Sequence, residues 1–177
     1  METQRNLLES AANLQSVLQQ AGIDSMVIGG LAVAAWGEPR SNNMEEEIKK
    51  LVGMMDLNPG AKEQSLLALS EETGYKFPHQ YLEFMRFSDG AEGPIGPNNY
   101  LVIWPINEIK ELNKGYAVDE FAPGLVLFGG DGGDTAYAFD TRSEEMPIVE
   151  VSLEDLDIRN VKPCGATFND FLEYISQ

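Results

Sequence analysis

The sequence predicts an α+β fold in which a small mixed, mainly antiparallel sheet packs against helices. Apolar residues follow helical spacing as far as about residue 90, and short alternating or continuous apolar runs then take over. The last segment, TFNDFLEYI, returns to helical spacing. Helices followed by strands and a closing helix are typical of α+β domains and not of alternating α/β folds.

Residues 1–43 are expected to form an N-terminal extension with the order helix, strand, helix. A helix over 5–20 should end at Gly22, and SMVI (25–28) should form a short strand before the helical LAVAAW. GEPRSNN then breaks the pattern, so we expect a boundary there and a domain over 44–177. Because so small a fragment cannot bury its own core, it should dock on that domain or pair with a second copy in a homodimer.

Three helices are expected at the start of the main domain. The first begins near Met44, and the second covers 63–73. The third begins at Pro78, whose missing N–H costs nothing in a first turn, and ends at Gly90. The buried face of the first helix should consist of Ile48, Leu51, Val52 and Met55.

The second half of the chain should supply the sheet. Four strands are expected in NNYLVIWP, GLVLFGG, TAYAFD and MPIVEVS, with the helix INEIKELNKGY after the first of them. Leu153–Gly165 is expected to be irregular. Thr167 and Asp170 resemble a capping box at the start of the final helix.

Composition narrows the classes of function. Twelve basic residues face 29 acidic ones, a net charge of −17, which disfavours binding to nucleic acid and to anionic membranes. Cys164 is the single cysteine and His79 the single histidine, so we expect neither a disulfide nor a zinc site. No apolar run spans a bilayer, and METQRNLLES does not resemble a secretory signal, so we expect a cytoplasmic protein.

The glycine-rich stretch FGGDGGDTAYAFD raises the question of a ligand loop. A phosphate loop would need a lysine after its glycines, and the stretch has none. A calcium loop is a possible alternative because Asp131 and Asp134 lie close together, but the EF-hand pattern is absent. We therefore expect a hairpin in which both aspartates shape the turn, with no metal and no cofactor.

Several motifs in order resemble those of the SUKH superfamily, which includes a fungal cell-wall regulator and bacterial immunity proteins. They are a Pro-x-x-Tyr-x-x-Phe helix, a Phe-Gly-acidic/Gly turn into a strand ending in Asp140, and a closing aromatic helix, and they cover about residues 44–177. The residues that match are Pro78, Tyr81, Phe84, Asp89, Gly90, Phe128, Gly129, Asp131, Gly132, Gly133, Asp140, Thr167, Phe168, Phe171 and Leu172.

The resemblance implies a non-catalytic protein-binding domain. One function that it implies is that of an immunity protein, which neutralises a toxin of a polymorphic or contact-dependent system. An alternative is a regulatory scaffold or signalling adaptor of the cell-wall-regulator type.

Residues 1–43 resemble the opening of a minimal nucleotidyltransferase, in which Gly29-Gly30 would bind nucleotide phosphates. The two metal-binding aspartates should then fall at Met44 and Glu46, so the expected Asp-x-Asp is absent. We interpret the segment as a truncated remnant, and a degenerate nucleotidyltransferase is the remaining enzymatic alternative.

Other residues that often carry chemistry have simpler interpretations here. His79 is expected to face solvent, since no nucleophile motif accompanies it, and Cys164 to be a buried thiol. Trp36 and Trp104 are expected in the core or at its edge, with ligand stacking as the alternative. No catalytic residue is predicted.

Acidic residues concentrate between Asp119 and Asp157. This stretch holds 11 acidic residues and one basic residue, Arg142, for a net charge of −10. We predict a face that binds a basic protein partner such as a toxin domain, with Asp140, Glu144 and Glu145 in the contact. The other expected members of this face are Asp119, Glu120, Asp131 and Asp134.

Overall fold

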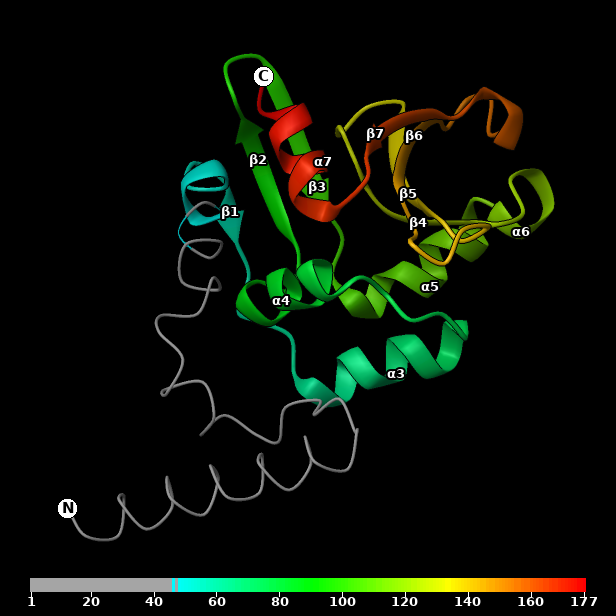
Figure 1. Ribbon diagram of the computed structural model, residues 1–177, viewed down its shortest axis with the longest axis horizontal. Helices are drawn as coiled ribbons and strands as arrows, with labels where there is room; N and C mark the ends of the chain where they lie inside the picture. The colour runs from blue at the N-terminus through cyan, green and yellow to red at the C-terminus, as the bar shows by residue number, and fades with distance from the viewer. Residues whose placement is uncertain (1–45, 47) are drawn as a thin grey trace, which may run out of the picture. The chain divides into compact units, whose positions relative to one another are not determined.

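The computed structural model describes residue 46 and residues 48–177, which belong to the second of two compact units, Glu46–Gln177. The elements expected in 1–43, including Gly29-Gly30 and Trp36, lie outside the described residues. Within them, the α+β prediction is confirmed: helices pack on a single sheet (Figure 1).

The sheet has seven strands, and each pairs antiparallel with the next strand in the chain. It is therefore a meander. The sequence predicted a mixed, mainly antiparallel sheet, and all pairings among the described strands are antiparallel. The strands are β1 (Asp56–Leu57), β2 (Ala91–Ile95), β3 (Asn99–Ile103), β4 (Leu125–Gly130), β5 (Thr135–Asp140), β6 (Ile148–Ser152) and β7 (Lys162–Gly165).

The helices expected from the sequence occur in the predicted order, together with a short helix and a 3₁₀ turn that were not expected. After a helical stretch over 48–51, they are α3 (Glu63–Thr73), α4 (His79–Phe87), α5 (Ile106–Gly115), α6 (Val118–Phe121), the 3₁₀ turn η2 (Ile158–Asn160) and α7 (Phe168–Ile175). Figure 1 shows α3, α4 and α5 grouped together, with α7 lying against the sheet near β7.

Three local expectations need correction. Pro78 is the N-cap of α4, and the helix ends at Phe87 with Ser88 as C-cap, so Gly90 instead lies directly before β2, with a φ of 86°. The segment expected to be irregular, Leu153–Gly165, contains η2 and β7. AEGPI was not recognised as a strand because it contains glycine and proline, yet it alternates buried and exposed residues as β2.

An aromatic cluster fills one face of the sheet. Tyr81 of α4 packs against both Phe128 of β4 and Phe139 of β5, with ring centroids 5.6 and 4.9 Å away. Phe168 and Phe171 extend the cluster from α7, and all five rings are buried. Offset and edge-to-face contacts of this kind add to the stabilisation that comes from burying the rings.

A capping box fixes the start of α7. Thr167 Oγ1 accepts a hydrogen bond from the Asp170 amide, and the Asp170 carboxylate accepts one from the Thr167 amide. The sequence-based prediction at these two residues is therefore confirmed. The cap lies directly before Phe168, so it helps to hold the aromatic face of α7 toward the sheet.

The other face of the sheet carries a second apolar cluster. It consists of Val118, Ala122, Leu125, Leu127, Ala136, Ala138, Val149 and Val151, and the half-buried Trp104, Leu153, Leu156, Ile158 and Val161 pack against it. Because β4 and the middle of β5 are buried on both faces, their sequences are almost continuously apolar.

Candidate protein-binding surface

The β4–β5 turn is shaped by Asp131. Its Oδ1 accepts hydrogen bonds from the amides of Gly133 (2.8 Å) and Thr135 (3.1 Å), and Gly132 supplies a φ of 78°. Burial raises the pKa of Asp131, but these hydrogen bonds more than offset it, so the net pKa lies below its ordinary value. Asp134 is exposed, and its carbonyl accepts from the Leu153 amide at 2.7 Å. Asp131 therefore has a structural role in this turn.

Most of the family-motif residues lie inside the molecule. Tyr81, Phe84, Phe128, Phe168, Phe171 and Leu172 are all buried. Phe128 sits at a β-bulge, where Leu127 pairs with Ala138 and Gly129 with Tyr137. Gly129 permits β3 to approach, because a Cβ there would lie 2.2 Å from the Val102 carbonyl oxygen. These motif residues build the scaffold and leave the surface to other side chains.

Asp89 of the Asp-Gly motif has a defined structural contact. Its Oδ1 accepts a hydrogen bond from the Ile106 amide at 2.8 Å, at the first residue of α5. The neighbouring Ser88 is fully buried, and its hydroxyl donates to the Gly90 carbonyl at 2.6 Å. The Asp89–Ile106 bond ties the segment after α4 to the start of α5.

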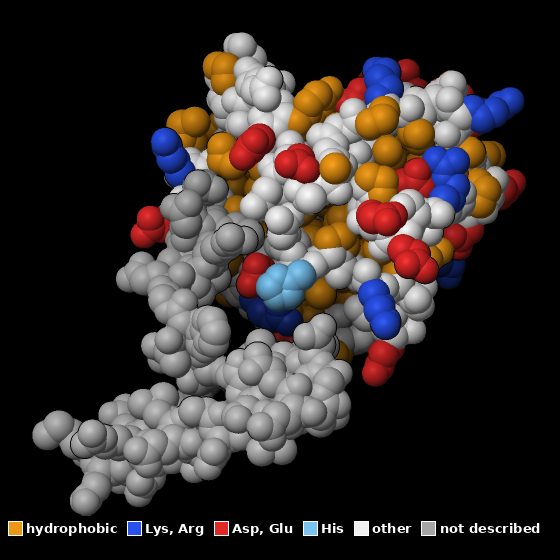
Figure 2. Space-filling view, viewed as in Figure 1, with side chains coloured by type: hydrophobic (Ala, Val, Ile, Leu, Met, Phe, Trp, Pro, Cys, Tyr) orange, Lys and Arg blue, Asp and Glu red, His pale blue; other side chains and the backbone are white. Residues whose placement is uncertain are grey.

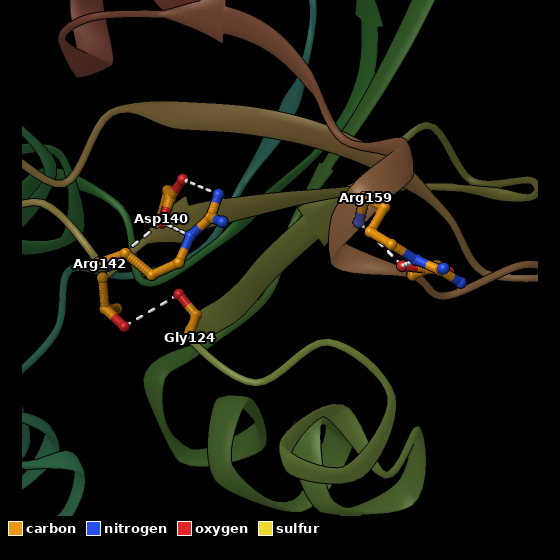
Figure 3. Close-up of polar contacts among 6 residues, drawn as sticks. Gly124, Asp140, Arg142 and Arg159 are labelled. Carbon is orange, nitrogen blue, oxygen red and sulfur yellow. Dashed lines mark hydrogen bonds and ion pairs between the residues drawn. The ribbon is translucent and has the colours of Figure 1, made fainter.

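Three of the eleven acidic residues are paired within the fold. Asp140 forms two hydrogen bonds with the Arg142 guanidinium, at 2.8 and 2.6 Å (Figure 3). Arg142 holds the pKa of Asp140 below its ordinary value. Asp157 makes the same kind of pair with Arg159, which lowers the Asp157 pKa to about 2, and Glu150 pairs with Lys162 at 3.1 Å.

Two further acidic residues accept hydrogen bonds from neutral groups. The Ser143 hydroxyl donates to the Glu145 carboxylate and lowers the Glu145 pKa, and the Asn160 amide donates to Asp155 at 2.9 Å. Both carboxylates are exposed. They still contribute to the negative potential of the surface.

The remaining carboxylates in the stretch are available to a partner. Within residues 48–177, their side chains make no hydrogen bond or ion pair, and all of them are exposed; they are Asp119, Glu120, Asp134, Glu144 and Glu154. Of the residues predicted from sequence for the partner contact, Asp140 is thus largely neutralised by Arg142, whereas Glu144 is free of such a partner. Figure 2 shows acidic, basic and hydrophobic side chains interspersed where β4–β7 and α6 lie.

The acidic residues occupy two ends of the β4–β5 hairpin. Asp131 and Asp134 lie at the turn, beside Leu153 after β6. At the opposite end, Thr141 donates to the Gly124 carbonyl, so the loop that carries Glu144 lies beside the segment that follows α6. The dense run of charge in the sequence therefore divides in space into a turn group and an α6-side group.

Residues considered for catalysis are not assembled into a site within the described chain. His79 is 78% exposed and lies 3.3 Å from Glu83, its neighbour one helical turn away. Cys164 is buried, and burial, with a contribution from Glu150, raises its thiol pKa to about 12. No group of three or more potential metal ligands gathers among residues 48–177, and no helix there is long and apolar enough to cross a bilayer.

Sequence reasoning missed two features of this surface. The cations that neutralise Asp157 and Glu150 are Arg159 and Lys162, which lie just beyond the counted stretch. The Asp-x-Arg spacing, which occurs at residues 140–142 and 157–159, indicates two of the three ion pairs in the sequence. Nothing in the sequence signalled the stacking of Trp104 on Tyr116.

The comparisons with known proteins agree with this architecture. The model of the SMI1 / KNR4 family (SUKH-1) matches residues 60–174. This range starts later than the domain predicted from sequence over 44–177, but it includes every motif residue named above. No curated protein matches the chain. The match covers more than half of the chain, so the protein belongs to the SMI1 / KNR4 family (SUKH-1).

Proposed function

We propose that the protein is a non-catalytic binding domain that acts as an immunity protein and neutralises a basic toxin domain. Membership of a family of protein-interaction domains supports the general class. The observation that supports a basic partner is the set of five exposed carboxylates, Asp119, Glu120, Asp134, Glu144 and Glu154, that have no side-chain partner in the described chain.

The charge of such a surface favours association with a cationic protein. Toxins that cleave nucleic acids carry basic surfaces, because they bind phosphates. An acidic inhibitor resembles their substrate in charge, and long-range attraction speeds the encounter when the salt concentration is low. The carboxylates that are free of internal cations contribute most to this field.

A regulatory scaffold is the second candidate. The same family membership supports this role, because the SUKH superfamily includes a cell-wall regulator as well as immunity proteins. Either role uses a protein partner, and the two roles differ in what binding does to the activity of that partner. An immunity protein abolishes the activity of its partner, whereas a scaffold leaves that activity in place.

Capture and co-expression together test the proposal. The full chain serves as bait in its native host, and the captured proteins are identified by mass spectrometry. Each one is then expressed in a heterologous cell with and without the full chain. We expect a basic protein that stops growth alone and is harmless in the presence of this chain. A captured partner that binds tightly but has no toxic activity would favour the scaffold, and a partner with an acidic binding surface would contradict the proposal.

A further inference from the structure

Trp104 and Tyr116 form an aromatic stack on the second face of the sheet. Their rings are nearly parallel, with an interplanar angle of 10° and centroids 6.3 Å apart. Trp104 follows β3 and is half-buried against the second apolar cluster, and its amide donates to the Phe128 carbonyl at 2.9 Å. Tyr116 follows α5 and is 38% exposed. The outer ring of the stack is therefore within reach of another molecule.

The backbone holds Tyr116 in place. Its amide donates to the Leu112 carbonyl at 2.9 Å, and the next residue, Ala117, has a φ of 50°. This is the left-handed region, which is unfavourable for alanine, and such strain tends to persist where surrounding contacts fix the chain. Ala117 is the N-cap of α6, which begins at the next residue, so this backbone conformation lies at the junction of α5 and α6.

The short helix α6, which begins two residues after Tyr116, carries two exposed carboxylates. Asp119 and Glu120 follow Tyr116 by three and four residues, and neither has a side-chain partner among the described residues. Phe121, on the same short helix, is 55% exposed. The nearby cation is Lys114 in the last turn of α5, so the charges of the segment 114–121 sum to −1.

We propose that the Trp104–Tyr116 stack receives an arginine or lysine side chain of the basic partner, with Asp119 and Glu120 beside the cation. The faces of aromatic rings attract cations, and a guanidinium can lie flat on tyrosine or tryptophan. Arginine and aromatic residues are both enriched at the centres of protein interfaces. This inference rests on the proposed function, because it assumes a protein partner with a positive surface.

Arginine peptides test the site without the partner. Trp36 and Trp104 are the two tryptophans, so a Trp36→Phe background leaves Trp104 as the sole indole reporter. The probe is acetyl-Gly-Arg-Gly-Arg-Gly-amide, and the control is the same peptide with citrulline, which has nearly the shape of arginine but no charge. We expect the arginine peptide to change Trp104 emission saturably at millimolar concentration and the citrulline peptide to leave it unchanged.

Variants assign the response to the stack. Tyr116→Leu, and separately the pair Asp119→Asn with Glu120→Gln, should weaken peptide binding at least fivefold. The matched pair Glu71→Gln with Glu173→Gln removes the same charge from α3 and α7 and should change binding less than twofold. Thermal melts identify a variant that is not folded. The acidic pair is exposed, so it keeps the test valid even when Tyr116→Leu lowers stability.

Three results would overturn the inference: no emission change with the arginine peptide, an equal change with the citrulline peptide, or full binding in both site variants. Failure here is distinguishable from failure of the proposed function. If a basic partner still binds this chain while the arginine peptide does not, only the inference of the aromatic site is contradicted. Peptide binding in a chain that protects against no toxin would remove only the immunity role.

Discussion

Tyr81 and Phe139 meet edge to face in the centre of the molecule, with ring centroids 4.9 Å apart and an interplanar angle of 69°. Tyr81 is fully buried, and its hydroxyl has no hydrogen-bond partner within the described residues. Burial, with a contribution from the charge of Asp89, raises the pKa of this hydroxyl well above its ordinary value. The family-motif tyrosine therefore contributes mainly through its ring.

Replacing Tyr81 with Phe should be tolerated and should raise the free energy of unfolding by about 1 kcal/mol, because it removes a buried hydroxyl without a partner. Urea unfolding measures the change. Tyr100→Phe is the control, since Tyr100 is exposed and its hydroxyl donates to Glu92 at 2.9 Å. A loss of more than about 1 kcal/mol in Tyr81→Phe would show that the hydroxyl has a partner, such as an internal water.

Gly129→Ala should lower the free energy of unfolding by about 2 kcal/mol or more, because its Cβ would lie 2.2 Å from the Val102 carbonyl oxygen and would push β3 and β4 apart. Gly115→Ala is the matched control. Position 115 has no atom within 4 Å of an added Cβ and lies in α5, where alanine should add about 0.5 kcal/mol. Equal melting temperatures for the two variants would refute the close approach of the strands.

The contribution of the Asp140–Arg142 pair should depend on pH. Arg142 lowers the folded-state pKa of Asp140, so the pair stabilises the fold above the unfolded pKa of about 3.9 and loses its effect as the pH falls through the folded value. Asp140→Asn should therefore be less stable than the parent near neutral pH, and the difference should shrink as the solution becomes acidic. Urea titrations at several pH values measure it.

Asp134→Asn is the control for this experiment, because the Asp134 carboxylate has no hydrogen bond or ion pair with the described residues. A stability difference between the parent and Asp140→Asn that stays constant from neutral to acidic pH would show that the ion pair does not account for it.

The boundary near residue 43 remains a prediction. We propose that residues 44–177 fold without residues 1–43, because seven paired strands and two apolar clusters lie within the described residues. Expression of 44–177 alone should give a soluble protein with one cooperative thermal transition. An insoluble product, or one that melts without a transition, would contradict the independence of this domain.

The sequence predicted the strongly periodic parts of the fold. Continuous apolar runs predicted β4 and β5, and the capping pair Thr167 and Asp170 predicted the start of α7. The pattern missed β2, because Gly93 and Pro94 disfavour a strand, and pairing with β1 and β3 stabilises this one. It missed β7 for a similar reason: four residues, KPCG, form a strand only beside β6.

Charge was easier to count in the sequence than to place. The surplus between Asp119 and Asp157 was evident, but local sequence does not show which carboxylates are neutralised by cations further along the chain. Glu150 meets Lys162 only because β6 and β7 pair. Trp104 and Tyr116 stack although the whole of α5 separates them in the sequence.

The proposal that exposed carboxylates attract a basic partner is tested most directly by the rate at which the chain associates with the captured partner at low salt. Asp119→Asn, Glu120→Gln and Glu144→Gln together remove three free carboxylates near α6, and Glu71→Gln, Glu111→Gln and Glu173→Gln remove the same charge from helices α3, α5 and α7. We expect the first triple variant to associate about tenfold more slowly, with a flatter salt dependence, and the second to stay close to the parent. Equal association rates for the two triple variants would contradict the proposal.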